Sequence, residues 1–289
     1  MAMRLENPDQ LSHLQHLDDI EVLGVPDAIS ESLSYPDQGN EACNQVEDAS
    51  YWFTHRNNCI SKLVKDLLPK GIMLDVGGGN GLTARALNDA GVDCWLVEPG
   101  RSGCCNARVR NVPTVIMATL EQLELPNNAV AGVGLFDVIE HLEHVQPLLR
   151  EVYRVVQPGG LIAVTVPALT WLWSSEDDYA GHFRRYTKKS LQRSVCDAGF
   201  EAYLSEYLFG PLVLPLLLCR SIPSRIGLRR GGDWKRASRE HGLNRGFLTS
   251  AVTRMLEREF RHLCRNRWPY LGTSCVIMAR KPGSRVDHG

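Results

Sequence analysis

Residues 74–81, which read LDVGGGNG, place one acid directly before a glycine-rich turn. Glycines let a ligand approach the backbone, and the N–H groups at the start of a following helix attract polar or anionic groups. Gly77, Gly79 and Gly81 fit the G-x-G-x-G turn of an S-adenosylmethionine (SAM) site. Gly79, Gly81 and Ala84 equally fit the G-x-G-x-x-A turn of a dinucleotide site. The turn alone does not decide between these cofactors.

Two acids accompany the turn. Asp75 precedes it, and Glu98 ends the next apolar run, where a carboxylate can accept hydrogen bonds from both hydroxyls of a ribose. SAM and NAD sites share this combination. Nicotinamide enzymes of the short-chain type also need a tyrosine with a lysine four positions later, and no tyrosine of this chain has that partner. The residues therefore favour SAM.

The elements that must position these residues alternate between strands and helices. Apolar runs predict strands at 71–77, 92–100, 112–118, 129–139, 161–168, 201–209 and 272–282. Helical spacings fill most of the intervals, which is typical of a parallel sheet with helices on both faces. We predict an α/β fold with a doubly wound, mainly parallel seven-stranded sheet, whose ligand lies at the carboxyl ends of the strands.

Composition divides the chain into four segments: an acidic N-terminal arm at 1–50, a core at 51–207, an apolar and basic insertion at 208–270, and a final strand and tail at 271–289. The arm has a net charge of -10, and its stretch 11–23 has the spacing of a helix. Residues 220–289 sum to +11. We expect two solvated surfaces; alternatively, the arm docks on the basic end, or that end attracts an anion.

The cysteines and the apolar runs indicate in which cellular compartment the protein is expected. The nine cysteines include no C-x-x-C pair, and the N-terminus lacks a charged-then-apolar signal segment. The longest apolar run, LFGPLVLPLLLC at 208–219, contains two prolines and falls well short of the ~20 residues that a spanning helix needs. We therefore expect a reduced, cytoplasmic protein.

Two later segments carry a family resemblance. LFDVIEHLEH follows the fourth predicted strand, and LREVYRVVQPGGLIAVTVP leads into the fifth. With the glycine turn and the distal acid, in this order, they resemble the class I SAM-dependent methyltransferases, specifically the bacterial group with a type 11 or type 23 methyltransferase domain. The resemblance covers about residues 51–207, with a looser echo at 271–282. It implies a Rossmann-like fold, SAM as methyl donor and S-adenosylhomocysteine as product.

The resemblance also implies the residues that bind the cofactor. They are Asp75, Gly77, Gly79, Gly81, Glu98, Thr119, Leu120, Phe136 and Asp137. In the family the turn wraps the methionine part, the acid at 98 holds the ribose, and the loop ATLEQL frames the adenine. Phe136 and Asp137 would line the place where the methyl group is exposed. The chain departs from the commoner pattern at Ala118 or Thr119, where many relatives have an aspartate, and at AVAGVGLFD, which replaces the usual S-F-D.

The segment 171–187, WLWSSEDDYAGHFRRYT, resembles a G-H-x-R-R-Y run of one subgroup of this family. Two arginines offer planar forks for a carboxylate or phosphate, and a histidine can take a proton near neutral pH. We therefore predict Arg184 and Arg185 as acceptor ligands; the alternative is an ordinary surface loop. The candidates for the catalytic base, in order of preference, are His182, His141 and Tyr186.

Helical spacing at 51–68 predicts a helix before the first core strand. Its Tyr51, Trp52 and Arg56 are expected to cover the SAM site and contact the acceptor; aromatic packing in the core is the alternative.

Carboxylates and imidazoles at 139–144, IEHLEH, are residue types that bind divalent metals. In the family that the chain resembles, Glu140 and His141 open a helix without metal. We therefore expect no metal.

These observations predict a SAM-dependent methyltransferase, a transferase of one-carbon groups, that acts on an oxygen, nitrogen or sulfur atom of a small-molecule or peptide acceptor in a biosynthetic pathway. A hydroxyl or thiol acceptor needs a base, whereas a carboxylate or free amine does not. The insertion and the acidic arm are expected to select the acceptor.

Other functions remain open. A lipid or quinone-type methyltransferase at a membrane surface would use a peripheral contact through 208–230, where apolar residues adjoin arginines. Arg101 near the ribose end could accommodate a modified, acidic SAM donor. A SAM-binding module without activity would also fit the fold. A nucleic-acid partner is not expected, because the core is near neutral and shows no groove of interleaved basic and aromatic residues.

Overall fold

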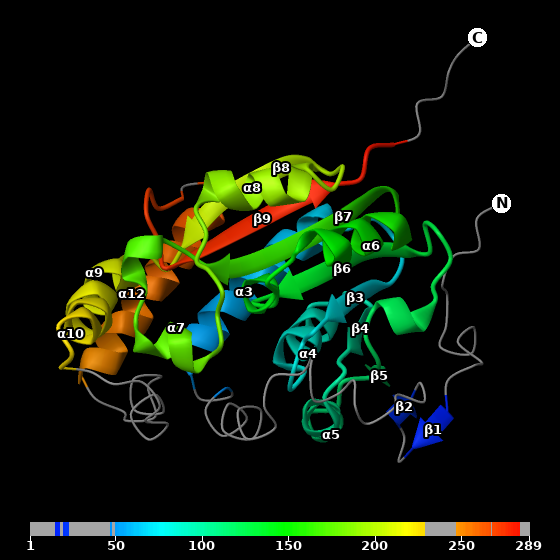
Figure 1. Ribbon diagram of the computed structural model, residues 1–289, viewed down its shortest axis with the longest axis horizontal. Coiled ribbons are helices and arrows are strands. Elements are labelled where there is room, and N and C mark those ends of the chain that lie inside the picture. The colour runs from blue at the N-terminus through cyan, green and yellow to red at the C-terminus, as the bar shows by residue number, and fades with distance from the viewer. Residues whose placement is uncertain are drawn as a thin grey trace, which may run out of the picture.

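A single nine-stranded sheet forms the centre of the fold (Figure 1). This computed structural model describes residues 15–17, 20–22, 47, 50–228, 247–266 and 268–283. The strands are β1 (Gln15–Leu17), β2 (Ile20–Val22), β3 (Met73–Val76), β4 (Cys94–Val97), β5 (Val115–Met117), β6 (Val130–Phe136), β7 (Val156–Pro167), β8 (Glu201–Leu208) and β9 (Ser274–Arg280). Their spatial order is β1-β2-β5-β4-β3-β6-β7-β9-β8.

The central strands run parallel, and β9 reverses the direction. β5, β4, β3, β6 and β7 pair in parallel, whereas β9 is antiparallel to both β7 and β8. All residues of β3, β4 and β6 are buried, as expected of strands with helices on both faces. The seven strands β5, β4, β3, β6, β7, β9 and β8, in this spatial order, confirm the predicted mainly parallel sheet.

The N-terminal arm contributes two more strands. β1 and β2 form an antiparallel pair, and β2 runs parallel to β5, with Glu21 opposite Ile116. The predicted helix over 11–23 is wrong for these residues. The spacing of apolar residues there also permits extended structure, and the edge of β5 offers unpaired N–H and C=O groups to a further strand. Tertiary pairing therefore overrides the helical pattern.

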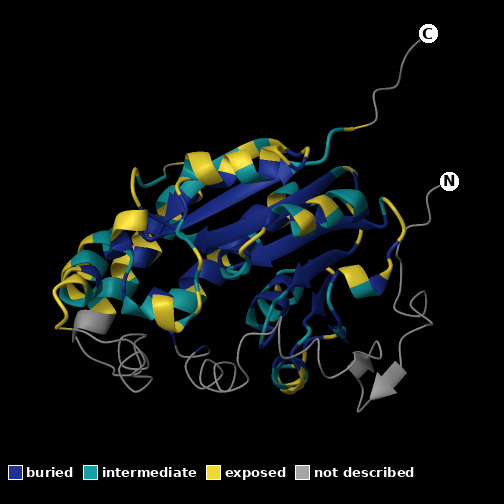
Figure 2. Cartoon of the chain, viewed as in Figure 1, coloured by how far each residue is buried: buried dark blue, intermediate teal, exposed yellow. Residues whose placement is uncertain are grey.

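Helices cover both faces of the sheet (Figures 1 and 2). They are α3 (Tyr51–Leu67), α4 (Leu82–Asp89), α5 (Arg101–Val109), α6 (Gln146–Val155), α7 (Ser175–Tyr179), α8 (Lys188–Cys196), α9 (Val213–Leu216), α10 (Ile222–Arg225) and α12 (Phe247–Leu263). One core cluster packs Leu149 and Val195 of α6 and α8 against one face. The other packs Ile60 and Leu87 of α3 and α4 against the opposite face. The doubly wound arrangement is therefore present.

Helix α3 agrees with the prediction at 51–68. Its N-cap is Ser50, whose hydroxyl accepts a hydrogen bond from the backbone N–H of Trp52 at 3.2 Å, and it ends at Leu67, with Leu68 as the C-cap before Pro69. Because α3 packs beside α4, it lies next to the glycine turn that begins α4.

Helix α12 is anchored to the core by a buried acid. The Glu259 carboxylate accepts hydrogen bonds from the backbone N–H groups of Phe209 and Gly210, each at 2.7 Å, and lies 2.9 Å from Nε2 of His55. These contacts join α12, α3 and the end of β8. None of the helices in the described ranges is long and apolar enough to span a bilayer.

Candidate active site

The glycine turn between β3 and α4 has a backbone that only glycine adopts readily. Gly77, Gly79 and Gly81 have φ angles of 70°, 53° and 74°, in the left-handed region. A Cβ atom on Gly78 would lie 2.5 Å from Oδ2 of Asp75. The turn therefore packs too closely against its neighbours for side chains, and it lies directly before the N-terminus of α4, whose N-cap Gly81 has no side chain to bond the first N–H groups.

Asp75 ends β3 with a fully buried carboxylate. Neither of its oxygens has a hydrogen-bonding partner of ordinary geometry among the described residues. Burial raises its pKa to about 7, although the charge of Arg56 and the N–H group of Ala84 oppose the shift. A buried acid whose oxygens lack a partner of ordinary hydrogen-bond geometry fits a site that receives the polar end of a ligand.

Glu98 lies at the carboxyl end of β4, beside the same turn. Its Oε2 accepts a hydrogen bond from the N–H of Gly79 at 2.9 Å, and its Oε1 accepts one from the N–H of Gly100 at 2.8 Å. A carboxylate oxygen can accept more than one hydrogen bond, which a contact with a ribose hydroxyl would require. Arg101, which follows at the start of α5, is exposed. The structure thus brings together the turn and the distal acid that the sequence paired.

A residue of the acidic arm also reaches this turn. Glu47 is buried; its carboxylate accepts from Nδ2 of Asn80 at 3.2 Å and forms an ion pair with Nη1 of Arg110 at 2.8 Å. Arg110 also donates to the backbone oxygen of Asn80 at 2.8 Å. The contact between Glu47 and Asn80 could not be predicted from the sequence, because no local pattern indicates a contact between residues 33 positions apart.

The loop after β5 lies next to Glu98, because β4 and β5 are neighbours. The N–H of Thr119 donates to Oε1 of Gln122 at 2.7 Å, and the side chain of Leu120 is buried in the core. The hydrogen bond of Thr119 therefore stabilises the start of the 3₁₀ helix Glu121–Leu123, and the Leu120 side chain packs beneath this helix in the core.

Arg56 and Asp137 tie α3 to the end of β6. The Arg56 guanidinium pairs with the Asp137 carboxylate and donates to Oγ1 of Thr83 at 2.8 Å. Asp137 has a φ of 59°, a strained value for this residue that such contacts help to maintain. It follows Phe136, which is buried. The Arg56 guanidinium is thus engaged within the protein, and the acceptor contact expected from the sequence stays a prediction.

The aromatic residues at the start of α3 pack internally. The Trp52 ring stacks on Phe209 at 5.2 Å with an interplanar angle of 5°, and Tyr51 packs against the same core cluster. The Arg56 guanidinium lies 5.1 Å from the centre of the Trp52 ring. These contacts favour the core-packing alternative over an acceptor contact for Tyr51 and Trp52.

Asp177, in the first turn of α7, forms the centre of a charged cluster. Its Oδ1 lies 3.0 Å from Nδ1 of His182 and 2.7 Å from Nε of Arg185, and its Oδ2 lies 3.0 Å from Nη2 of Arg185. Burial by itself would raise the pKa of Asp177, but the His182 and Arg185 contacts outweigh it and lower that pKa to about 2. Because an ionised carboxylate can only accept a hydrogen bond, the donor in this contact is the protonated Nδ1 atom of His182.

The rest of the G-H-x-R-R-Y run fastens it to the turn after β6. Nη2 of Arg184 donates to the backbone oxygens of Leu142 at 3.2 Å and Glu143 at 2.5 Å. The buried Tyr186 hydroxyl donates to the backbone oxygen of Ile139 at 3.5 Å, and burial raises its pKa to about 12. Arg184 and Arg185 are thus engaged within the protein, and burial disfavours the ionised form of Tyr186. The roles of the two arginines as acceptor ligands and of Tyr186 as a base stay predictions.

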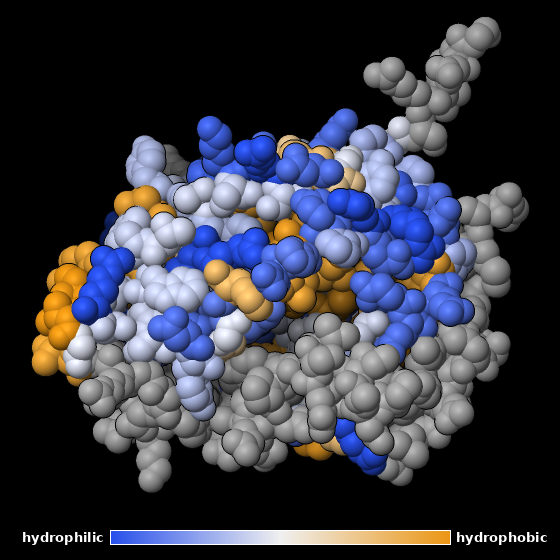
Figure 3. All heavy atoms as spheres, viewed as in Figure 1, coloured by the Kyte–Doolittle hydropathy of each residue, from blue (hydrophilic) through white to orange (hydrophobic). Residues whose placement is uncertain are grey.

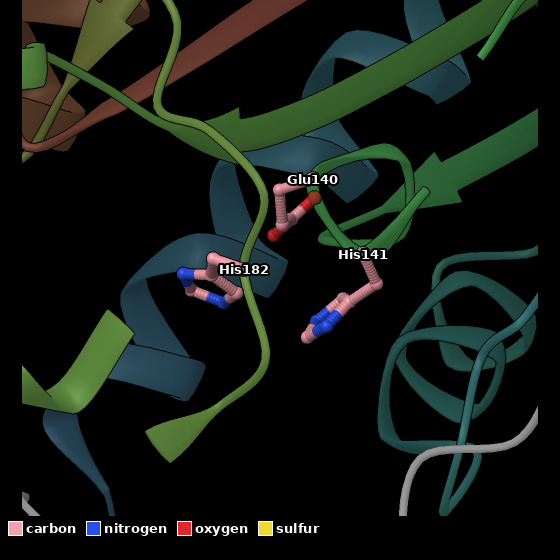
Figure 4. A group of neighbouring side chains, drawn as sticks. All are labelled: Glu140, His141 and His182. Carbon is pink, nitrogen blue, oxygen red and sulfur yellow. The ribbon is translucent and has the colours of Figure 1, made fainter. Parts of the chain in front are cut away.

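Glu140, His141 and His182 gather between these segments (Figure 4). Their ligand atoms all lie within 4.8 Å of one another, and the rings of His141 and His182 are 4.8 Å apart. Burial raises the pKa of Glu140 well above its ordinary value, and its carboxylate oxygens have no hydrogen-bonding partner among the described residues. Burial and the neighbouring His182 lower the pKa of His141 to about 4. One carboxylate and two imidazoles also suit a divalent metal, which the sequence did not lead us to expect.

The sequence of the core matches a known family. A family described as a methyltransferase domain matches residues 52–205. The chain is 26% identical over 183 residues to a probable S-adenosylmethionine-dependent methyltransferase of Mycolicibacterium smegmatis, covering 62% of this chain and 70% of the relative. A probable S-adenosylmethionine-dependent methyltransferase of Mycobacterium tuberculosis is 26% identical over 165 residues, covering 56% of this chain and 60% of the relative.

Solved structures share the fold. A phosphoethanolamine N-methyltransferase of Haemonchus contortus in complex with SAM superposes with a TM-score of 0.56 at 18% identity, covering 90% of this chain and 61% of that chain. A possible histamine N-methyltransferase of Thermotoga maritima superposes with a TM-score of 0.51 at 21% identity, covering 83% of this chain and 98% of that chain. This chain thus spans less than two thirds of the Mycobacterium tuberculosis and Haemonchus contortus proteins.

The family match covers more than half of the chain, and it includes the glycine turn, Glu98 and the end of β6. The buried Asp75, whose oxygens lack a hydrogen-bonding partner of ordinary geometry among the described residues, and the left-handed glycines of the turn fit the cofactor of that family. The chain therefore belongs to the class I SAM-dependent methyltransferases, and SAM is its cofactor.

Proposed function

We propose that the protein transfers the methyl group of SAM to a hydroxyl oxygen or thiol sulfur of a small-molecule or peptide acceptor, as one step of a biosynthetic pathway. The observation that carries this proposal is the contact between Asp177 and His182, which gives the site an oriented base. A site for an amine or carboxylate acceptor would not need one.

The cofactor is held by the residues at the carboxyl ends of β3, β4 and β5. The glycine turn and Asp75 would hold the methionine part, Glu98 would accept from the ribose, and the loop at 118–123 would frame the adenine. When bound, SAM supplies a methyl group on a sulfonium, which is already activated for transfer. The protein chiefly has to align the acceptor with it.

His182 is the base. Its Nδ1–H donates to Asp177, so the other ring nitrogen carries the lone pair that accepts a proton. This is the arrangement by which a carboxylate fixes the tautomer and orientation of a catalytic imidazole. The lowered pKa of His141, about 4, makes that residue a weak proton acceptor, so it ranks behind His182.

Methyl transfer from SAM to a panel of hydroxyl, thiol and amine compounds tests the proposal, with S-adenosylhomocysteine formation as readout. We expect turnover of hydroxyl or thiol compounds, and a loss of ~10²–10⁴-fold in kcat for His182→Ala. His144→Ala, which removes an exposed neighbouring histidine, is the matched control and keeps wild-type turnover. Binding of S-adenosylhomocysteine stays intact in both variants.

Two outcomes would contradict this assignment. Methylation of amines alone, unaffected by His182→Ala, would remove the need for a base. Loss of turnover on adding a chelator, with recovery on adding zinc or manganese, would instead assign His182 to metal binding together with Glu140 and His141, whose ligand atoms are close enough for it.

A further inference from the structure

The segment after β8 exposes a row of large apolar side chains. Leu214, Leu218, Ile222 and Ile226 are 61%, 54%, 39% and 63% exposed. They recur every fourth residue along α9, the π-helical turn Leu217–Ser221 and α10, so they share one side of this helical run. Figure 3 shows apolar side chains gathered at the end of the molecule where α9 and α10 lie. Single exposed leucines are ordinary, but a contiguous apolar patch marks an interaction site.

A basic row lies on the adjacent helix. Arg254, Arg258 and Arg261 of α12 are exposed, and Arg265 follows just beyond its end, at spacings of four, three and four residues. These arginines form no ion pair with the described part of the chain. α12 contacts the short 3₁₀ helix Gly210–Leu212, which leads directly into α9, and Arg225 adds a further exposed positive charge at the end of α10.

We propose that the apolar row of α9 and α10, with the basic row of α12, binds the surface of an anionic lipid bilayer. An apolar helical face with flanking arginines is the composition of segments that lie in the membrane interface. The leucine and isoleucine side chains enter the acyl boundary, and the arginines contact the lipid phosphates. The helical run is too short to span the bilayer, which suits a peripheral contact.

Charge decides against a second copy on this surface, and the described residues of the acidic arm are engaged elsewhere. Residues 220–289 carry a net charge of +11, so a second copy of the chain would bring like charges together. The acidic arm carries the opposite charge, but β2 pairs with β5, and Glu47 is held by Arg110, which directly follows α5. α5 lies well away from α9 and α10 in Figure 1.

The same helical run is bonded to the segment that carries the base. Oγ of Ser221 donates to the backbone oxygen of Leu172 at 2.8 Å, and Oγ of Ser224 accepts from the N–H of Ser175 at 2.8 Å. Arg225 donates to the backbone oxygen of Trp171 at 2.7 Å. If the proposed role of His182 holds, a bilayer-bound enzyme would present its acceptor site to amphiphilic compounds. Bilayer binding itself does not depend on that role.

Flotation of the full chain with vesicles tests the proposal. We compare vesicles of phosphatidylcholine with vesicles of equal parts phosphatidylcholine and phosphatidylglycerol. We expect flotation with the anionic vesicles, weakened by salt. It is abolished by the combined Leu214→Gln, Leu218→Gln and Ile226→Gln substitutions. The combined Arg254→Gln, Arg258→Gln and Arg261→Gln substitutions should lower the partition coefficient about fivefold per arginine.

One control variant and one measurement of folding accompany the flotation test. Val109→Gln alters an apolar residue of α5 that is 80% exposed, and should float like the wild type. Binding of S-adenosylhomocysteine reports that each variant is folded, whatever the outcome with lipid. Absence of flotation, or flotation that survives both sets of substitutions, would overturn the proposal. A concentration-dependent dimer abolished by the leucine and isoleucine substitutions would assign the surface to a second copy instead.

Discussion

The Nδ1 atom of His182 lies 3.0 Å from Oδ1 of Asp177, and the same carboxylate is held by the guanidinium of Arg185. Asp177 also accepts from the N–H of Ser174 at 2.9 Å, as the third residue of a capping box at the start of α7. The buried Asp177 carboxylate therefore caps the start of α7 and holds the side chains of Arg185 and His182 in place. The orientation of His182 is determined by this set of contacts, which contains no cofactor or acceptor.

Acid should weaken the fold through Asp177. Its pKa of about 2 in the folded protein lies below the ordinary 3.8, so its ionised form stabilises the fold. This contribution is complete above about pH 4 and is lost as the pH falls towards 2. We expect the free energy of unfolding, measured by urea titration, to fall across this interval.

Asp177→Asn should remove that pH dependence and cost about 3–5 kcal/mol at pH 7, because it leaves the buried Arg185 without its carboxylate. The exposed neighbour provides the control: Asp178→Asn should preserve both the pH dependence and most of the stability. Equal acid sensitivity of Asp177→Asn and the wild type would contradict this role.

Asp75→Asn should stabilise the cofactor-free protein at alkaline pH. Burial raises the Asp75 pKa from 3.8 to about 7, so the folded protein holds a proton that the unfolded chain releases between these values. Stability from this group is present below pH 4 and is lost as the pH rises through about 7. An amide avoids the buried charge. We expect the Tm of Asp75→Asn to exceed that of the wild type at pH 8, and the difference to shrink at pH 5. A lower Tm at pH 8 would count against this account.

The glycine turn should tolerate no side chain at residue 81. Gly81 has a φ of 74°, and a Cβ there would lie 2.6 Å from Cβ of Ala107. Gly159 has a φ of 75° with no atom within 4 Å of such a Cβ, so Gly159→Ala isolates the backbone cost of about 1–2 kcal/mol. Gly81→Ala should cost about 1–3 kcal/mol more, by overpacking, and should weaken binding of S-adenosylhomocysteine. Urea unfolding and calorimetric titration measure both effects. Equal losses in the two variants would refute a steric role for the turn.

Patterns of neighbouring residues in the sequence predicted the buried strands, the glycine turn and the acid beside it. The buried strands follow from their apolar runs, and the φ angles of Gly77, Gly79 and Gly81 follow from a turn that only glycine forms readily. Glu98 was placed correctly beside the turn because neighbouring parallel strands end at the same edge of the sheet.

The remaining features depend on contacts between distant residues. The pairing of Arg56 with Asp137 joins residues 81 positions apart, and its partner could not be inferred from the spacing within α3. Asp177 lies in an acidic stretch that reads as an exposed helix start, and only the folded chain shows its carboxylate under His182 and Arg185. The strands of the acidic arm form for the same reason, because the edge of β5 supplies a partner that the arm itself lacks.

Isothermal titration of S-adenosylhomocysteine into the purified protein tests the central claim most directly, with NADH as the parallel ligand and Asp75→Ala as the comparison variant. We predict micromolar binding of S-adenosylhomocysteine, its loss in Asp75→Ala, and no heat from NADH. Binding of NADH without binding of S-adenosylhomocysteine would mean that Gly79, Gly81 and Ala84 form a dinucleotide turn, and would contradict the assignment of the site to SAM.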